Sequence, residues 1–324
     1  MEINVQDGNG SLFAVSRKQT IFKNRTLGGL TMRKSRKAIP YIFIAPHIIL
    51  FIIFFLIPVV FGIYASFTKW NIFQDPIWVG LNNYKLILFS QESTFYRQFW
   101  NGLKNTVIFV VMCVPFQILI PLVIACMLSL KPKGRNLFQG IFYVPTLFSI
   151  TSVTLTWFFI FNRSLGLFNR MFLTDINWYG EQPFAWMTIV ITTLWWGIGG
   201  NMIIYVAALN GVDQAVLEAG AMDGAVGIKK FWYITLPSIK MPLLYTVVAS
   251  IIAQFNIYGQ PVMLTAGGPS ESTNVLMMYI RGLAFGIGNP IAGTASAMAT
   301  CLGLVIGIIS LGQMFVMRKT AGGD

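Results

Sequence analysis

Six long apolar runs, separated by short polar segments, dominate the chain. None of the runs contains Asp or Glu, and Lys and Arg occur only at their edges. About 20 apolar residues in a helix are enough to cross ~30 Å of hydrocarbon. The pattern therefore predicts an all-α polytopic membrane protein with six transmembrane helices. These cover roughly residues 39–67, 105–129, 138–161, 184–209, 240–264 and 295–317.

The distribution of basic residues predicts the orientation. If the N-terminus is cytoplasmic, the cytoplasmic segments hold sixteen of the 23 Lys and Arg residues. Such a bias is typical of cytoplasmic loops, so both termini are expected in the cytoplasm. The net charge of +12 is then mostly explained by the basic residues of the cytoplasmic segments. The basic stretch 17–37 is interpreted as a flank beside anionic lipid headgroups rather than a nucleic-acid-binding segment.

Three parts of the chain follow from this pattern. Residues 1–38 form a polar, basic, cytoplasmic N-terminal segment, residues 39–317 the transmembrane domain, and residues 318–324 a cytoplasmic tail. The first apolar run is expected to remain as an uncleaved anchor, because it is too long for a signal peptide. Between the first two runs, residues 68–104 are rich in Trp and Tyr, which predicts interfacial helices at headgroup level. The apolar run 275–287 is too short to span and is expected to lie in the interface or dip into the bundle.

Several kinds of chemistry are missing. The chain has no G-x-x-x-x-G-K-[ST] phosphate loop and only one histidine, His47, so no catalytic residues, metal site or cofactor are expected in it. No Asp, Glu, Lys or Arg lies at mid-depth in a span, which argues against an ion-driven carrier, although backbone and hydroxyl oxygens can hold sodium. A self-sufficient secondary carrier or channel remains an alternative, and a membrane enzyme is disfavoured. Energy, if used, is expected to come from another chain.

The cytoplasmic loop at about residues 210–238 carries the most polar residues between two spans. Asp213 can cap a helix over residues 214–219, and Gly224 can end it. A second short helix is expected over residues 228–234, ended by a proline. Two short helices joined by glycine would form a compact knob able to transmit force. An ordinary amphipathic linker is the alternative.

The sequence of this loop resembles the cytoplasmic signature of binding-protein-dependent ABC importer permeases. That signature, E-A-x-A-x-D-G followed after nine residues by I-x-L-P, corresponds here to Glu218–Gly224 and Ile234–Pro237. The one departure from the family is Gly220, which occupies the first x of this signature, where the family more often has alanine. Together with Leu264–Pro269 after the fifth run, the resemblance is to the carbohydrate-uptake branch of the maltose and glycerol-phosphate type.

The resemblance implies the transmembrane-domain fold of type I ABC importers in a bacterial cytoplasmic membrane. It implies a coupling helix inserted into a cleft of an ATPase, formed by Glu218, Ala219, Gly220, Asp223 and Gly224. The implied partners are a second permease subunit in a heterodimer, two ATP-binding subunits, a periplasmic or lipid-anchored solute-binding protein and the lipid bilayer. ATP and Mg would bind to the ATPase subunits.

The resemblance to the maltose-type permease also implies a substrate path. Sugars present apolar ring faces to an indole and hydroxyls to amides, which both donate and accept. The alternative is that these side chains only pack the bundle or bond between helices. Overall similarity suggests an oligosaccharide, as in alginate importers, yet no cation for an anionic sugar lies at mid-depth. The residues that match the sugar site by position are Thr146, Thr193, Trp195, Gly197, Gln254 and Asn256.

Overall fold

The computed structural model describes residues 4–6, 12–14, 41–286, 288 and 290–321. The chain divides into two compact units, Met1–Val59 and Val60–Asp324. Most of the predicted N-terminal segment 1–38, and the end of the tail after Ala321, lie outside the described residues. In the first unit, β1 (Asn4–Gln6) and β2 (Leu12–Ala14) form an antiparallel pair, which the sequence pattern did not predict.

The first apolar run forms one helix, Tyr41–Ser66. It contains a π-helical turn, η1 (Ile52–Leu56), followed by α2 (Ile57–Ser66). Pro58 is the second residue of α2 and lacks an N–H for the helical ladder. A π-turn at this point is one way in which a helix accommodates such a break.

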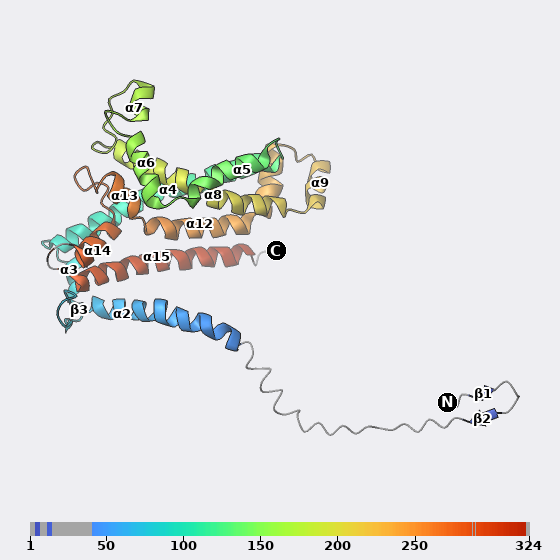
Figure 1. Ribbon diagram of the computed structural model, residues 1–324, viewed down its shortest axis with the longest axis horizontal. Coiled ribbons are helices and arrows are strands. Elements are labelled where there is room, and N and C mark those ends of the chain that lie inside the picture. The colour runs from blue at the N-terminus through green and yellow to red at the C-terminus, as the bar shows by residue number, and fades with distance from the viewer. Residues whose placement is uncertain (1–3, 7–11, 15–40, 287, 289, 322–324) are drawn as a thin grey trace. The chain divides into compact units, whose positions relative to one another are not determined.

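Helices make up nearly all of the second unit after a short hairpin of β3 (Thr68–Lys69) and β4 (Ile77–Trp78) (Figure 1). The elements in chain order are α3 (Asn82–Leu88), α4 (Thr94–Ser129), α5 (Arg135–Tyr143), η2 (Val144–Leu147), α6 (Ile150–Ile160), α7 (Leu167–Phe172), α8 (Phe184–Asn210), α9 (Gln214–Met222), α10 (Ile228–Lys230), η3 (Phe231–Thr235), α11 (Leu236–Ser238), α12 (Lys240–Phe255), α13 (Gly259–Leu264), α14 (Leu276–Phe285) and α15 (Ala292–Ala321).

Four helices are long and apolar enough to cross a membrane: Tyr41–Ser66, Thr94–Ser129, Phe184–Asn210 and Ala292–Lys319. Two bent pairs also qualify, and among the described residues they raise the number to six if each pair is one span. The pair Arg135–Leu147 and Ile150–Ile160 bends by 101°, and the pair Ile228–Ser238 and Lys240–Phe255 by 72°. The protein is therefore a helical membrane protein with four to six candidate spans.

Three of the predicted runs differ in the structure. The third run, predicted as one helix over residues 138–161, is broken between Leu147 and Ile150, where its two parts bend by 101°. The helix predicted from residue 105 begins at Thr94, because its first turns pack Phe99 into the core beside Leu276. Consequently, the predicted interfacial stretch 68–104 contains a hairpin, α3 and the start of α4. The fifth run is not one helix: α12 ends at Phe255 and α13 starts at Gly259.

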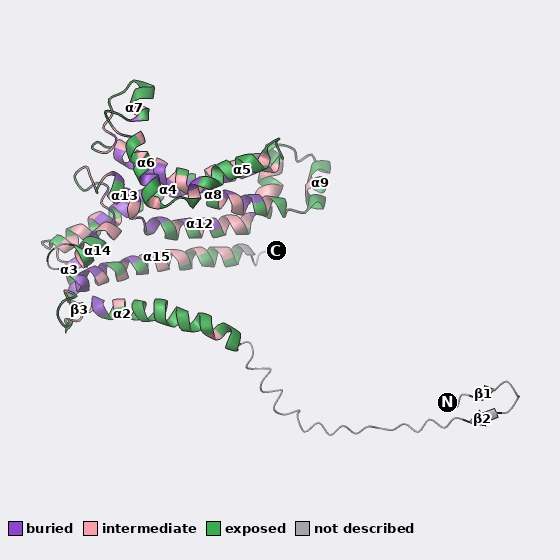
Figure 2. Ribbon diagram, viewed as in Figure 1, coloured by how far each residue is buried: buried purple, intermediate pink, exposed green. Residues whose placement is uncertain are grey.

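The core of the second unit lies where α4 packs against α8 and α12, and Figure 2 shows further buried positions on α13 and on the part of α15 next to α14. One buried cluster joins Val114 and Ile118 of α4 to Phe255 of α12. Another joins Leu122 of α4 to Met202 of α8. Helix α14 packs on α4 and α15 through Leu276 and Ile280, which are buried. The predicted short apolar segment thus dips into the bundle.

Candidate functional site

Two glutamine side chains meet in the interior between α4 and α12. Nε2 of Gln254 donates to Oε1 of Gln117 at 2.7 Å. Both residues are buried, with 8% of Gln117 and 6% of Gln254 exposed. A buried amide without a partner would cost about 1–3 kcal/mol, so this pairing stabilises both groups in an apolar bundle.

A glycine on α8 makes room for this amide pair. A Cβ at Gly197 would lie 2.7 Å from Nε2 of Gln117, closer than real Cβ contacts. One turn further along α8, Nδ2 of Asn201 donates to the backbone oxygen of Gln117 at 3.0 Å and to Oγ of Ser250 at 3.1 Å. Three helices are thus joined at one level by neutral polar groups.

The amide pair borders a cavity of about 330 Å³, within the usual size range for small-molecule sites. None of its lining residues, all of them described, carries a charge. Amides both donate and accept hydrogen bonds, and the aromatic rings offer flat apolar faces, so the lining suits a neutral ligand rich in hydroxyls. The cavity is lined by Gln117, Ile150, Thr193, Trp196, Gly197, Ala253, Gln254, Asn256, Ile257, Tyr258, Gly259 and Gln260.

Four of the six residues predicted for the substrate path line this cavity: Thr193, Gly197, Gln254 and Asn256. The other two lie elsewhere. Thr146 sits in η2, where its Oγ1 donates to the Tyr143 carbonyl at 2.6 Å. Trp195 packs edge-to-face on Trp157, with ring centroids 5.7 Å apart.

Sequence reasoning missed other lining residues, above all Gln117 and Trp196. The indole Nε1 of Trp196 donates to the Phe148 carbonyl at 3.1 Å, at the break between η2 and α6. Gln117 carried a usable signal, since it is an amide in the middle of an apolar run, between Pro115 and Pro121. Such groups normally face a partner or a cavity. The choice between Trp195 and Trp196 had no signal in the sequence.

The cytoplasmic loop predicted around residues 210–238 forms a second distinctive region. As predicted, Asp213 caps α9: its Oδ1 accepts from the Ala215 N–H at 2.9 Å. Gly224 ends the helix region with φ +77°, a left-handed conformation that glycine adopts readily. Pro237 does not end the next helical stretch as predicted. It follows the π-helical turn η3, and α11 continues to Ser238.

One contact joins the two halves of this loop. A Cβ at Gly220 would lie 1.9 Å from Cδ1 of Ile234, so α9 approaches η3 closely at this glycine. The Ala225 N–H also donates to the Gly220 carbonyl at 2.8 Å, which turns the chain back after α9. Of the predicted coupling residues, Glu218, Ala219, Asp223 and Gly224 are exposed and Gly220 is half-buried.

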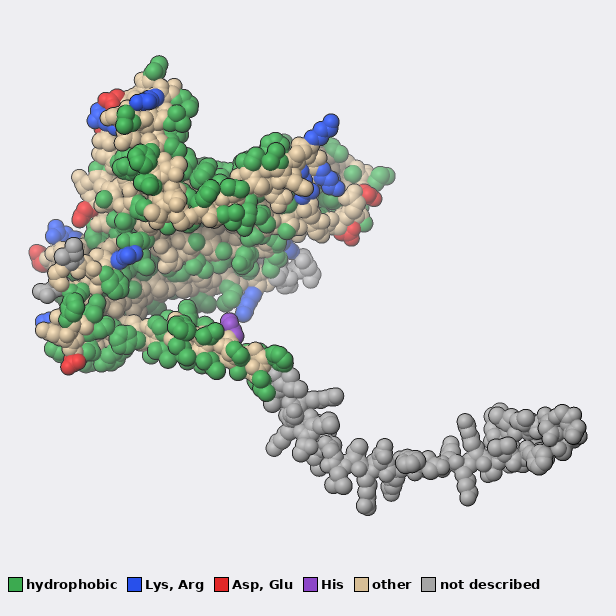
Figure 3. All heavy atoms as spheres, viewed as in Figure 1, with side chains coloured by type: hydrophobic (Ala, Val, Ile, Leu, Met, Phe, Trp, Pro, Cys, Tyr) green, Lys and Arg blue, Asp and Glu red, His purple; other side chains and the backbone are tan. Residues whose placement is uncertain are grey.

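The loop also exposes large apolar side chains. Met222 is 89% exposed and Tyr233 78%, and Ile228 and Trp232 are exposed as well. Figure 3 shows acidic and basic side chains near α9 and α5, while hydrophobic side chains are spread over the visible face between the ends of the helices. Apolar side chains beside charged ones are typical of a protein interaction surface.

The protein is a multi-pass membrane protein built around a polar site. Helices of membrane length surround a neutral polar cavity, and a helical loop is exposed at one end.

No protein-family model matches the chain. Among curated proteins, it is 30% identical over 297 residues to the probable ABC transporter permease protein YesP of Bacillus subtilis, covering 88% of this chain and 93% of that one. It is 31% identical over 286 residues to the arabinooligosaccharides transport system permease protein AraP of the same organism, covering 86% and 88%.

The chain belongs to the family of ABC transporter permease proteins. A third relative, the probable starch degradation products transport system permease protein AmyD of Thermoanaerobacterium thermosulfurigenes, is 30% identical over 288 residues, covering 86% of this chain and 94% of that one. The resemblance to carbohydrate-type importer permeases drawn from the sequence is thereby confirmed.

The fold is similar to that of a solved permease chain. A chain in the crystal structure of a bacterial alginate ABC transporter, in complex with alginate pentasaccharide-bound periplasmic protein, aligns with a TM-score of 0.72 at 22% identity. The alignment covers 90% of this chain and 97% of that one. This likeness identifies the fold of the chain.

Proposed function

We propose that this protein is a membrane-spanning subunit of an ATP-driven importer and forms part of the path for a sugar or oligosaccharide. The observation that carries the proposal is the uncharged cavity between α4, α8 and α12, with the Gln117–Gln254 amide pair at its edge. Amide and indole groups match the hydroxyls and ring faces of a carbohydrate. The sugar-transport names of curated relatives such as AraP and AmyD support this substrate class.

The α9 loop supplies the connection to an energy source. Its helix is capped by Asp213, closes on η3 at Gly220 and exposes Met222 and Tyr233. We assign it the coupling role predicted for Glu218–Gly224, in which a separate ATPase binds the loop. A helical loop joined directly to α8, and held by the bound ATPase, would pass ATPase movement to the cavity-lining helix.

The remaining subunits follow from the same role. The assembly would contain a second permease subunit in a heterodimer, two ATP-binding subunits that hold ATP and Mg, and a periplasmic or lipid-anchored binding protein. Both termini and the α9 loop would face the cytoplasm of a bacterial cell, as the basic-residue bias predicts. An alginate-type oligosaccharide is one substrate within the proposed class.

Reconstitution into liposomes tests this proposal. The chain, co-purified with its partner subunits, should take up labelled oligosaccharide only when ATP is inside with the ATPase. Uptake by this chain alone, without ATP, would instead establish a self-sufficient carrier and reject the proposal.

One variant tests the cavity within that assay. Asn256 lines the cavity and its Nδ2 donates to the Ile252 carbonyl at 2.8 Å. Asn256→Ala should raise the KM for uptake about tenfold through loss of a ligand hydrogen bond, with ATPase association unchanged. Thr300→Val is the matched control, because Thr300 lies on α15 away from the cavity and bonds only within its own helix. Unchanged uptake in Asn256→Ala would remove this residue from the path.

A further inference from the structure

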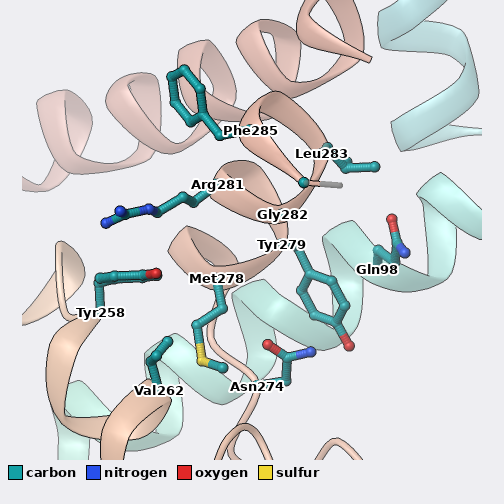
Figure 4. Close-up of a pocket in the computed structure, with 11 residues that line it drawn as sticks. Gln98, Tyr258, Val262, Asn274, Met278, Tyr279, Arg281, Gly282, Leu283 and Phe285 are labelled. Atoms are coloured by element: carbon teal, nitrogen blue, oxygen red, sulfur yellow. The ribbon is translucent and has the colours of Figure 1, made fainter. Parts of the chain in front are cut away.

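A second, larger cavity of about 580 Å³ lies where α14 meets α13 and the start of α4 (Figure 4). Tyr258 lines both this cavity and the smaller one, so the two cavities adjoin at this residue. The described residues lining the larger cavity include one cation and no acidic side chain. They are Gln98, Tyr258, Val262, Asn274, Met278, Tyr279, Arg281, Gly282, Leu283, Phe285 and Gly286.

The cation is Arg281, an exposed residue of α14. Its Cζ lies 4.7 Å from the centroid of the Tyr258 ring. A guanidinium stacked on an aromatic ring keeps its N–H edge free, and that edge matches a carboxylate in a bidentate arrangement. Tyr258 therefore orients Arg281 at the junction of the two cavities for an anionic group.

Acceptors without donors lie on another side of the same cavity. Oε1 of Gln98 and Oδ1 of Asn274 are buried and receive no hydrogen bond. Figure 4 shows Gln98, Asn274 and Tyr279 on the side of the cavity away from Arg281. A buried acceptor without a donor costs free energy, and a ligand hydroxyl would relieve that cost.

The wall carrying these acceptors is held firmly in place. Nδ2 of Asn105 donates to the carbonyls of Glu271 and Asn274 at 2.9 and 3.0 Å. Oγ1 of Thr106 accepts from the Leu276 N–H at 3.0 Å. Nδ2 of Asn101 donates to the Tyr279 hydroxyl at 3.0 Å. A wall fixed by these bonds offers a preformed site, so little ordering is required when a ligand binds.

We propose that this larger cavity is a binding site for an acidic sugar unit, and that the substrate occupies it before it reaches the smaller, neutral cavity. Arg281 binds the carboxylate, Gln98 and Asn274 accept hydroxyl hydrogens, and the sugar ring lies beside Tyr279. The inference rests on the proposed function and narrows its substrate class to oligosaccharides that carry a carboxylate. An anionic lipid headgroup without a sugar or inositol ring offers a similar charge but lacks the ring hydroxyls that Gln98 and Asn274 require.

A pair of matched probes tests the site. Trimers of galacturonate and of glucuronate are compared with their methyl esters, which keep every ring hydroxyl and lose the charge. Binding to the permease, purified with its partner subunits in nanodiscs of zwitterionic lipid, is measured by calorimetry. Arg281→Gln should weaken the acid trimers about tenfold and leave the esters unchanged. Gln98→Leu should weaken acids and esters alike, about fivefold.

The control is Arg170→Gln, which removes an exposed arginine of α7 that lines neither cavity and should change no affinity. Equal binding of acids and esters to the wild type, or unchanged acid binding in Arg281→Gln, would overturn the inference. So would an anionic lipid that displaces the trimers and is retained by the wild type but not by Arg281→Gln.

The two proposals fail separately. If neutral trimers are taken up with ATP, and Arg281→Gln leaves the affinity for acid trimers unchanged, only the acidic binding site is rejected. Acid-selective binding without ATP-dependent uptake would reject the importer alone.

Discussion

The two loops that flank α8 hold their shape in different ways. The α7 loop, residues 161–183, is organised around Asn169, which is buried with 5% exposed. Its Nδ2 donates to the carbonyls of Arg163 and Ile176 at 3.0 and 2.9 Å. Its Oδ1 accepts from Thr174 Oγ1 at 3.1 Å and from Trp178 Nε1 at 2.8 Å. One side chain thus fixes both arms of the loop.

Aromatic packing reinforces the α7 loop. The ring of Phe161 is fully buried and stacks on Phe168, with centroids 4.8 Å apart. Trp178 packs on both rings, at 5.0 Å from Phe161 and 5.7 Å from Phe168. These three rings therefore pack against one another, although other apolar side chains of the loop, such as Leu173 and Phe172, are exposed.

The α9 loop, residues 211–239, has much less internal support. None of its described residues is buried except Ile239 at its end. Its main internal links are the Asp213 cap and the approach of Gly220 to Ile234. Both loops expose apolar side chains, so the difference between them lies in their internal contacts. The α7 loop is held by its own hydrogen bonds and rings, whereas the α9 loop has few such links and would be held in place by a partner.

The largest expected effect comes from breaking the centre of the α7 loop. Asn169→Leu removes four hydrogen bonds and leaves the Trp178 N–H without an acceptor, so local stability should fall by about 3–4 kcal/mol. Hydrogen exchange should accelerate across residues 161–183 and stay unchanged in α9. Asn177→Ala, which removes a single bond to the Gly180 N–H, is the control and should cost only about 1 kcal/mol. Similar exchange in the two variants would show that Asn169 does not organise the loop.

The next effect concerns the turn after α9. Gly224 has φ +77° and open space around it, so a substitution there acts through the backbone alone. Gly224→Val should cost about 1–3 kcal/mol in this conformation, reorient the loop and abolish stimulated ATP hydrolysis by the assembled complex, with the chain still inserted in the membrane.

Gly224→Asn is the matched control, because asparagine tolerates left-handed backbone better than valine. It should retain most of the coupled activity. Wild-type uptake and ATP hydrolysis in Gly224→Val would contradict the coupling role of this turn.

Sequence reasoning succeeded where the determining interactions are local. The apolar runs identified the helices, because hydropathy depends on each residue alone. Asp213 and Gly224 marked the two ends of α9, since a cap and a left-handed turn act within a few residues. The orientation of the chain and the coupling role of α9 stay predictions.

The features that were missed depend on contacts between distant segments. The apolar character of the fifth run does not reveal the break at residues 256–258. After this break Gly259 packs against Ile150, so closely that a Cβ at Gly259 would lie 2.5 Å from Ile150 Cδ1. The partnership of Gln117 with Gln254 joins residues 137 positions apart. The position of Arg281 over the Tyr258 ring depends on how α13 and α14 fold together, and no local sequence signal predicts it.

A smaller effect is expected at the start of α9. Asp213→Ala removes the acceptor of the Ala215 N–H and should destabilise the helix by about 1 kcal/mol. Because few other bonds hold this loop, hydrogen exchange in residues 214–222 should accelerate about fivefold in the isolated chain. Binding of the ATPase subunits should restore protection. Asp213→Asn, which keeps a cap, should behave like the wild type, and persistent fast exchange in the assembled complex would argue against a partner covering this loop.

The smallest effect is a pH dependence confined to the α7 loop. Arg163 donates to Asp175 through Nε at 2.8 Å and Nη2 at 2.7 Å, and this bonding holds the pKa of the Asp175 carboxyl below its usual value. Because the pKa of Asp175 is lower in the folded protein, the stabilisation is fully present above its pKa in the unfolded chain, ~3.9. It is lost as the pH falls through the pKa of the folded state. Both side chains are exposed, so salt should weaken the effect further. Hydrogen exchange, corrected for its intrinsic rate at each pH, should therefore stay constant in this loop from pH 7 to 5 and rise slightly below about 4. Asp175→Asn should remove that rise, and an equal rise in the variant would assign it to another group.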